Sequence, residues 1–393
     1  MTEILVVGLP GPTHNYGGLS YGNEASMENE AETSNPQKAA LQSLAKMKFL
    51  NDLGVKCVVM PIQERPFFPI LRRIGFEGSK ELMLDQAKKK APWIFKYISS
   101  SAFMWTANAG TVSPSIDTST RKVQFTAANL QSGLHRFIEA ETTSQNLKRV
   151  FSNPVFFEHH SPLPNHSHFA DEGAANHLRF SKFQLGADTP GIHVFVYGIN
   201  PETDREVKPQ KYPARQSKLA SEAIARQHKL FDKQVLFVQQ SPKAIDAGAF
   251  HNDVISMGHL NLFIYHEYAF QNPNEFLKNL ENKVSSYCDT NLNSIKVLES
   301  ELPLEDAISS YFFNSQIITQ PDGSFILIAP SNCLEVPRAK AYIEEMISRS
   351  DIPLSSVHYM DLKQSMKNGG GPACLRLRAV VNNNEFSAIN QNF

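Results

Sequence analysis

The residues with the clearest chemical potential lie near the carboxyl end, in the stretch KNGGGPACLRLRAVV. Three glycines and a proline precede Cys374, and an alternating apolar pattern typical of a strand follows it. Consecutive glycines cost backbone entropy and pack nothing, so they mark a place where the backbone approaches another group closely or takes positive φ. A thiol at such a turn is well mounted for a nucleophile, although a cysteine is more often a small buried hydrophobe.

A candidate base lies in AFHNDVISMG, where Asp253 follows His251 by two positions. In an extended segment this spacing puts both side chains on one face, so an imidazole and a carboxylate are expected to face one cavity. The alternative is a turn before a strand, in which Asp253 accepts hydrogen bonds from backbone amides.

A carboxylate is a further candidate in DEGAANHLR, where Glu172 follows Asp171 and precedes a glycine and two alanines. Small residues beside a carboxylate would let a ligand come near. The same pattern also fits a helix amino terminus, with acids placed favourably against the helix dipole.

Histidines gather in the loop EHHSPLPNHSH, and imidazole is a common zinc ligand. The prolines between them do not supply a helix that would hold two ligands on one face, so a metal site is the weaker interpretation. The members of this cluster are His159, His160, His166 and His168.

The elements that must position these side chains begin with a strand over residues 4–9 and a helix opened by Asn35 and Pro36. The helix is expected to end at Gly54. Its apolar positions recur every third residue and predict a buried face made of Leu41, Leu44, Met47, Leu50 and Leu53.

Strand-like and helix-like stretches alternate along the rest of the chain, with Ser79 as a cap before the helix ELMLDQAKKK. This alternation predicts an α/β fold in which helices cover strands, and the absence of a low-complexity linker predicts a single domain. The segment 200–211 is expected to be an exposed excursion. The remaining strands are expected in residues 55–60 and in KVQFTAAN, IHVFVYG, QVLFVQQ, LNLFIYHEYAF and SFILIAP, and the helices in SQNLKRVF, SKLASEAIARQHKLF, NEFLKNLENKVSSY and RAKAYIEEMIS.

Composition excludes several classes of partner. The chain has 393 residues, 41% of them hydrophobic, and a formal net charge of −1, so it has no field to hold nucleic acid or an anionic membrane. No stretch reaches the roughly 18 apolar residues that span a bilayer, and the amino terminus lacks the basic flank of a secretory signal. A small-molecule substrate fits better.

The four cysteines lie far apart without a CxxC pair, which argues against a zinc ribbon or a disulfide framework. Such usage is typical of a reducing compartment, so we expect a cytoplasmic protein.

Several stretches together resemble one family, that of the N-succinylarginine dihydrolases in the guanidine-modifying (pentein) superfamily. They occur in the family's order and are spread over most of the chain. The stretches are THNYGGLSYGNEAS, ERPFFPILRRIGF, MWTANAGTVSPS, DEGAANH, KYPARQ, QQSPKAIDAGAFHNDVI, FNSQ and SMKNGGGPACLRLR.

The resemblance implies a fold of five pseudo-repeated ββαβ units, a five-fold α/β propeller around a central channel. It implies the conversion of N2-succinylarginine and two waters into N2-succinylornithine, two ammonia and carbon dioxide in arginine catabolism, with no metal or organic cofactor. It also implies a longer carboxyl end, so we expect that the family's usual tail is lacking, and a homodimer is left open.

Carried over residue by residue, the resemblance assigns the nucleophile to Cys374, the catalytic histidine to His251 and the catalytic acid to Glu172. Asp253 and Asn108 would hold the guanidinium, and Arg215 with Arg136 would meet the substrate's carboxylates. The substrate-binding positions implied are Gly18, Leu19, Ser20, Gly22, Asn23, Asn108, His135, Arg136, Arg215, Asp253 and Asn368.

Three rival functions stay open at this point. A deiminase would stop after one hydrolysis and release one ammonia. A non-catalytic homologue would bind the ligand without turnover. A metal hydrolase would use the loop histidines and lose activity to a chelator.

Overall fold

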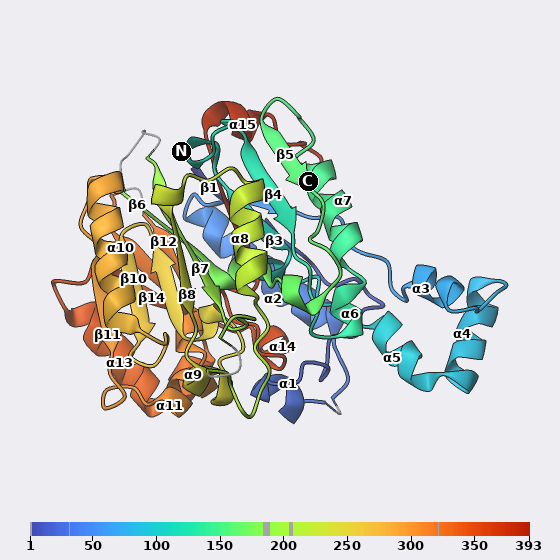
Figure 1. Cartoon of the computed structure of the whole chain (residues 1–393). Coiled ribbons are helices and arrows are strands. Elements are labelled where there is room, and N and C mark those ends of the chain that lie inside the picture. Colours follow the sequence, from blue (N-terminus) through green and yellow to red (C-terminus); the bar gives the residue numbers. More distant parts are fainter. Residues whose placement is uncertain (1, 31, 184–188, 204–206, 321) are drawn as a thin grey trace.

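The computed structural model describes residues 2–30, 32–183, 189–203, 207–320 and 322–393. These residues form five sheets of three strands each (Figure 1). The α/β fold class is therefore confirmed. In order across each sheet, the strands are β15 (Leu377–Val381), β1 (Thr2–Val7), β2 (Lys56–Val59); β3 (Gly110–Ser113), β4 (Val123–Ala127), β5 (Phe157–His160); β6 (His177–Ser181), β7 (Gly191–Tyr197), β8 (Val235–Gln239); β9 (Ser256–His259), β10 (Leu262–His266), β11 (Asn293–Val297); and β12 (Gln316–Thr319), β13 (Phe325–Pro330), β14 (Leu354–Met360).

Each sheet repeats one connection pattern. The middle strand pairs antiparallel with one neighbour and parallel with the other. A helix links the parallel pair, because parallel strands need a crossover of a dozen or more residues. The crossover helices are α2 (Pro36–Asp52), α7 (Ala140–Val150), α8 (Lys218–Gln227), α10 (Pro273–Cys288) and α13 (Pro337–Ser348), and α7, α8 and α10 lie on the outside of the molecule in Figure 1.

The first sheet joins the two ends of the chain. Strand β15 pairs antiparallel with β1, with Thr2 opposite Val381 and Val6 opposite Leu377. The turn that carries Cys374 comes directly before β15. The closing strand therefore fixes the turn against the amino-terminal strand, although the two segments are far apart in the sequence.

Helix α2 begins as predicted, because Asn35 caps it by accepting a hydrogen bond from the amide of Lys38. The predicted buried face is wrong at two positions, since Leu41 is 60% exposed and Leu44 is 44% exposed. A repeat of three drifts away from the 3.6-residue turn, so it cannot follow one face. The buried residues of α2 are instead Ala39, Ser43, Lys46 and Leu50.

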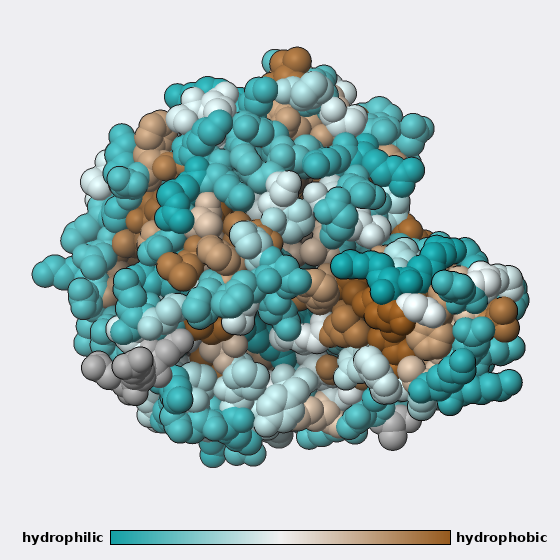
Figure 2. Space-filling model, turned by 45° about the vertical axis from the view of Figure 1, so that its right-hand side comes forward, coloured by the Kyte–Doolittle hydropathy of each residue, from teal (hydrophilic) through white to brown (hydrophobic). Residues whose placement is uncertain are grey.

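Three helices form an arm between β2 and β3. They are α3 (Phe68–Arg73), α4 (Lys80–Lys90), which Ser79 caps as predicted, and α5 (Pro92–Ser99). Figure 2 shows the arm as a lobe on the right-hand side, with hydrophobic residues gathered where it meets the rest of the molecule. Its own small core consists of Phe68, Leu71, Met83, Ala87, Ile94 and Ile98.

The predicted strands and helices all occur, with ends that differ by a few residues. The predicted excursion over 200–211 is described only in part, because residues 204–206 lie outside the described ranges, while Gln210 and Lys211 are exposed. The short helices that complete the fold are α1 (Glu24–Glu28), α6 (Leu134–Phe137), α9 (Pro242–Asp246), α11 (Leu304–Ser309), α12 (Asn332–Glu335), α14 (Lys363–Met366) and α15 (Asn383–Ser387).

Among the described residues, none of the helices combines the length and the apolar character that crossing a membrane requires.

Candidate active site

Cys374 is buried at the end of the glycine-rich turn, with 3% of its surface exposed. Its sulfur has two polar neighbours. Asn314 Nδ2 donates to Sγ at 3.2 Å, and Sγ donates to Asp253 Oδ2 at 3.4 Å. The backbone carbonyl of Cys374 accepts from the amide of Ala107 at 3.1 Å. The thiol is thus fixed from both the side chain and the backbone.

The glycines before Cys374 are required by close approach and by positive φ, as predicted. Gly369 has φ of +73°, and a Cβ on Gly370 would lie 2.0 Å from Nε1 of Trp105. Lys46 adds an anchor from helix α2, since its Nζ donates to the carbonyl of Pro372 at 2.6 Å.

The surroundings of Cys374 favour the neutral thiol over the thiolate. Burial raises the pKa of its thiol well above the usual value, and the neighbouring carboxylate of Asp253 raises it further. The hydrogen bond from Asn314 and the charge of Arg376 act in the opposite direction. A cation placed beside the sulfur would favour the thiolate.

His251 lies in the same pocket as Cys374. Its Nε2 is 2.7 Å from Oε2 of Glu172, while its Nδ1 has no hydrogen-bond partner within the described part of the chain. Burial lowers the pKa of His251, and Glu172 counteracts this through its charge and its hydrogen bond. The imidazole can therefore exchange a proton with a bound ligand through the free nitrogen.

Glu172 is fully buried and holds the site together. Its carboxylate pairs with both terminal nitrogens of Arg136, and its carbonyl accepts from Nδ2 of Asn108 at 2.8 Å. Burial opposes ionisation, but Arg136 and His251 hold the pKa of Glu172 well below its usual range. Glu172 precedes a short 3-10 turn over 173–176, as a residue at a helix amino terminus would. Its carboxylate nevertheless bonds the side chains of His251 and Arg136 and not the amides of the turn.

The spacing of His251 and Asp253 predicts an extended segment, but Asp253 does not lie in one. Only His251 is extended, and residues 252–254 form a 3-10 turn before β9. The turn places the Asp253 carboxylate against the sulfur of Cys374, where it also lines a second pocket. The predicted extended backbone is therefore wrong, but both side chains lie beside Cys374, His251 in its pocket and Asp253 in contact with its sulfur. The alternative, an Asp253 bonded to backbone amides, is not seen among the described residues either.

The pocket shared by Cys374 and His251, called the front pocket below, has a cavity volume of about 40 Å³. It brings together most of the predicted site residues. Of these, Leu19, Ser20, Asn23, Asn108, His135, Arg136, Arg215, His251, Asn368 and Cys374 line it.

Gly18 and Gly22 are not among the residues that line the front pocket, but Gly18 is bonded to one that does. The amide of Gly18 donates to Oδ1 of Asn368 at 2.9 Å, and Nδ2 of Asn23 donates to the carbonyl of Asn368 at 2.7 Å. Gly18 has φ of +64°, and a Cβ there would lie 2.1 Å from Cα of Glu30. Asn368 thus ties the amino-terminal loop to the turn that carries the thiol.

Arg215 is a buried cation without an acidic partner in the described ranges. It donates to Oγ of Ser20 at 3.1 Å and to the carbonyl of Tyr21 at 2.7 Å, and its guanidinium stacks on Phe250 at 4.8 Å. Its Nε has no partner among these residues. Burial and the nearby charge of Arg136 lower the pKa of Arg215 to about 10.

Arg136 does not stand free for a substrate, contrary to the prediction that paired it with Arg215. Its guanidinium is engaged by Glu172, because a buried acid needs a cation and the fork of an arginine suits a carboxylate. His135, its neighbour, is uncharged at neutral pH, since burial and nearby arginines lower its pKa to about 3.

Three further residues of the site had no predicted role. Asn314 contacts the sulfur and belongs to FNSQ, which resembles the family but gave no local reason to single it out. Trp105 lines the front pocket and donates from Nε1 to Oγ of Ser365 at 2.9 Å. Lys46, on helix α2, bonds the carbonyl of Pro372 just before the thiol's alanine neighbour.

The loop histidines do not assemble a metal site. His159 and His160 bond the carbonyl of Phe151 and the amide oxygen of Gln124, and the rings of His166 and His168 contact each other edge to face. Within the described ranges, no group of three or more histidine, cysteine or acidic side chains could hold a metal ion.

The repeated sheets are those of a mixed α/β protein, and the pocket of Cys374 and His251 is the candidate active site of a hydrolase. A family model described as succinylarginine dihydrolase matches residues 1–393. The chain belongs to the succinylarginine dihydrolase family.

Curated relatives named N-succinylarginine dihydrolase match over nearly the whole chain. The protein of Shewanella denitrificans is 49% identical over 384 residues, which is 98% of this chain and 85% of that protein. The protein of Idiomarina loihiensis is 46% identical over 390 residues, or 99% of this chain and 86% of that protein.

Solved structures share the fold at low identity. The N-terminal domain of ArgZ, a cyanobacterial arginine dihydrolase bound to its product, has a TM-score of 0.53 and 15% identity, covering 96% of this chain and 98% of that domain. A variant of AgrE in complex with L-arginine has a TM-score of 0.56 at 15% identity, covering 97% of this chain and 40% of that chain.

Proposed function

We propose that this chain hydrolyses N2-succinylarginine with two waters to N2-succinylornithine, two ammonia and carbon dioxide, through a covalent intermediate on Cys374. The observation that carries the proposal is the front pocket, which holds a thiol, an imidazole with a free nitrogen and an unpaired buried arginine. Membership of the succinylarginine dihydrolase family supports the choice of substrate.

The first round begins when the substrate's guanidinium lies against Cys374 and Asp253, between acidic and amide groups. The cation lowers the pKa of the thiol, whose proton passes to the free nitrogen of His251, and the thiolate adds to the central carbon. His251 gives a proton to the departing ammonia, which leaves an amidino group on sulfur. Water, deprotonated by His251, then attacks the carbon and frees a ureido compound and the thiol.

The second round repeats this chemistry on the ureido carbon. Thiolate addition and loss of the second ammonia leave a thiocarbamate on Cys374. Hydrolysis by the second water releases a carbamate, which breaks down to N2-succinylornithine and carbon dioxide. Glu172 holds the ring of His251 in place throughout and stabilises its charged form.

Arg215 is the residue that pairs with a carboxylate of the substrate. It is buried, lines the front pocket and has no acidic partner in the described part of the chain. A guanidinium fork pairs a carboxylate in bidentate fashion, so a ligand with carboxylates would neutralise it.

We infer the finer architecture from the repeated connections. The five sheets form a five-fold pseudosymmetric propeller of ββαβ units, and the pairing of β15 with β1 closes it into a single catalytic domain. A cytoplasmic location and a homodimer belong to the same proposal. Size-exclusion chromatography with light scattering measures the oligomeric state directly.

Counting ammonia per succinylarginine consumed tests the proposed reaction. The account expects two ammonia and one succinylornithine for each substrate, and no ammonia from Cys374→Ala. One ammonia with a ureido product would identify a deiminase instead. Tight binding of succinylarginine without any ammonia would identify a non-catalytic binding protein.

A further inference from the structure

A second pocket lies behind Cys374 and has a cavity volume of about 80 Å³. We call it the rear pocket. It shares no lining residue with the front pocket, but neighbours in sequence line the two on either side of one wall. Ala107 and Ala373 line the rear pocket, while their neighbours Asn108 and Cys374 line the front pocket.

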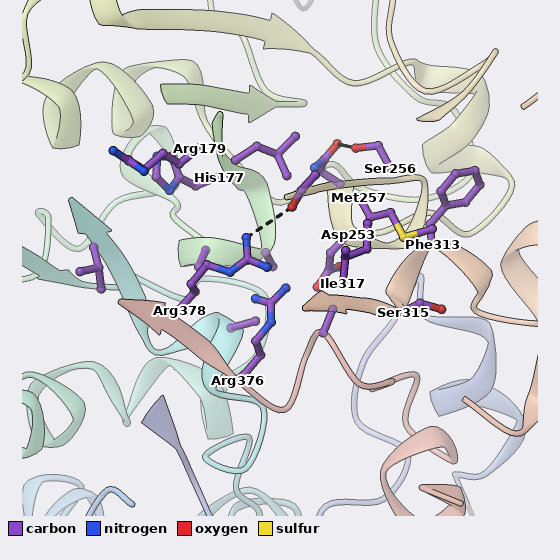
Figure 3. Close-up of a pocket in the computed structure, with 18 of the residues that line it drawn as sticks. His177, Arg179, Asp253, Ser256, Met257, Phe313, Ser315, Ile317, Arg376 and Arg378 are labelled. Carbon is purple, nitrogen blue, oxygen red and sulfur yellow. Dashed lines mark hydrogen bonds between the residues drawn. The ribbon is translucent and has the colours of Figure 1, made fainter. Parts of the chain in front are cut away.

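Three arginines line the rear pocket and give it a positive charge. Figure 3 shows Arg376 and Arg378 side by side, with their guanidinium groups directed into the pocket. Arg179, the third arginine, is engaged by Asp117 at 2.6 Å. Arg378 is engaged by Glu3 at 3.0 Å and donates to the carbonyl of Gly258.

Arg376 is the arginine of the rear pocket that has no acidic partner in the described part of the chain. Its side chain has no hydrogen bond and no ion pair among the residues that the structure describes, and its Nε is buried. A buried donor such as this Nε is costly without a partner, because it has lost water without gaining an acceptor. Burial and the charge of Arg378 lower the pKa of Arg376 to about 9, so it remains a cation at neutral pH.

A second unpaired group faces Arg376. Asp253 also lines the rear pocket, and its Oδ1 is buried without a partner in the described ranges, while its Oδ2 accepts from the thiol of Cys374. A ligand that satisfies both groups must offer acceptor oxygens to a guanidinium and a proton to a carboxylate. Bicarbonate does both, since it is a planar monovalent oxyanion with one hydroxyl.

We propose that the rear pocket binds bicarbonate between Arg376 and Asp253, and that its occupancy slows the chemistry at Cys374. The choice of ligand rests on the proposed function, because the carbon dioxide released there gives bicarbonate and a proton on reaction with water. The slowing follows from charge. Arg376 favours the thiolate of Cys374, and an anion bound to Arg376 cancels that influence.

Isothermal titration of the full-length protein with sodium bicarbonate, without succinylarginine and at constant ionic strength, measures the binding. The account expects one site per chain. Arg376→Met should weaken binding at least about tenfold, because a charged hydrogen-bond partner is lost. Arg349→Met, on a surface arginine paired with Asp351, is the control and should bind as the wild type does.

Nitrate, a planar anion without a proton, should bind about tenfold more weakly than bicarbonate, because it cannot donate to Asp253. Absence of bicarbonate binding to the wild type, equal binding to Arg376→Met, or equal binding of nitrate each overturns the proposal. Should Arg376→Met fail to fold by circular dichroism, Arg376→Lys keeps the charge, loses the planar fork and serves in its place.

The link to Cys374 is measured by its rate of alkylation with iodoacetamide as a function of pH. Bicarbonate should move the wild-type profile to higher pH and leave that of Arg376→Met unmoved. An equal movement in both proteins contradicts the link. Neither measurement uses turnover, so a failure of the proposed reaction would leave both results standing.

Discussion

The sulfur of Cys374 lies 3.4 Å from the carboxylate of Asp253, so the candidate nucleophile rests beside an acid in the absence of substrate. The Asp253 carboxylate raises the pKa of the Cys374 thiol. Burial raises the pKa of Asp253, and its hydrogen bond with the sulfur acts in the opposite direction. The pair therefore favours a neutral thiol until a cation arrives. Such an arrangement couples activation of the nucleophile to binding of a guanidinium.

Replacing Asp253 with asparagine should separate reactivity from turnover. Without the carboxylate, the pKa of Cys374 falls, so the alkylation profile with iodoacetamide moves to lower pH. Turnover nevertheless drops, because the guanidinium loses its anionic partner. Asn314→Ala is the matched contrast, since removing its hydrogen bond to sulfur should move the profile to higher pH. Movement of both profiles in the same direction would refute this electrostatic account.

Glu172→Gln should lower kcat by about 10²- to 10⁴-fold, the usual worth of general acid–base help. The variant removes the charge that raises the pKa of His251. The protonated imidazole is then confined to lower pH, so the alkaline limb of the pH profile of kcat should move to lower pH. An unchanged profile would mean that Glu172 does not act through His251.

The same substitution should reduce stability. It leaves the buried Arg136 without its anion, at a cost of about 3 kcal/mol in the free energy of unfolding. Urea denaturation followed by circular dichroism measures this cost. Combining Glu172→Gln with Arg136→Met removes both buried charges. The double variant should therefore be more stable than Glu172→Gln alone.

Asp171→Asn should stabilise the protein at neutral pH. Burial raises the pKa of Asp171 to about 6, although it accepts hydrogen bonds from the amide of Gly173 and from Gln216. An acid with a raised pKa in the folded state weakens the fold as pH rises from about 4 to about 6. Asparagine avoids ionisation and should gain about 1–3 kcal/mol above pH 6.

The pH dependence of that gain is the decisive observation. Below about pH 4 the acid is protonated in the folded and unfolded states alike, so Asp171→Asn and the wild type should be equally stable there. Urea denaturation at several pH values gives the comparison. A gain that is the same at all pH values would have another cause.

Arg215→Met should raise KM for succinylarginine by about 10- to 100-fold, because a charged hydrogen bond to a carboxylate is lost. The methionine fills similar space beside Phe250, so the fold should survive. Arg72→Met, on the exposed surface of the arm, is the control and should leave KM unchanged. An unchanged KM in Arg215→Met would assign the carboxylates of the substrate to other residues.

Local signals in the sequence predicted the elements better than the faces they bury. Asn35 and Ser79 cap helices α2 and α4, because side-chain capping depends only on neighbouring residues. The buried face of α2 depends on what packs there. Lys46 is buried because it reaches the carbonyl of Pro372, a residue 326 positions away, which no local pattern of hydrophobicity contains.

The site was predictable as single residues and not as contacts. Three glycines marked the turn of Cys374 correctly, since close packing against Asn23, Trp105 and Asn314 demands them. The spacing of His251 and Asp253 misled, because it assumed an extended backbone where a 3-10 turn forms. That Glu172 takes Arg136 for its partner depends on burial, which only the packed fold determines.

The central claim is that the sulfur of residue 374 becomes covalently attached to the substrate's carbon. Acid quenching during turnover of succinylarginine, followed by mass spectrometry of the peptide that contains Cys374, tests it most directly. The account predicts an amidino adduct on this cysteine in the wild type and none in Cys374→Ser, which should also be inactive. Turnover that persists in Cys374→Ser, with no adduct on the wild-type peptide, would contradict the account.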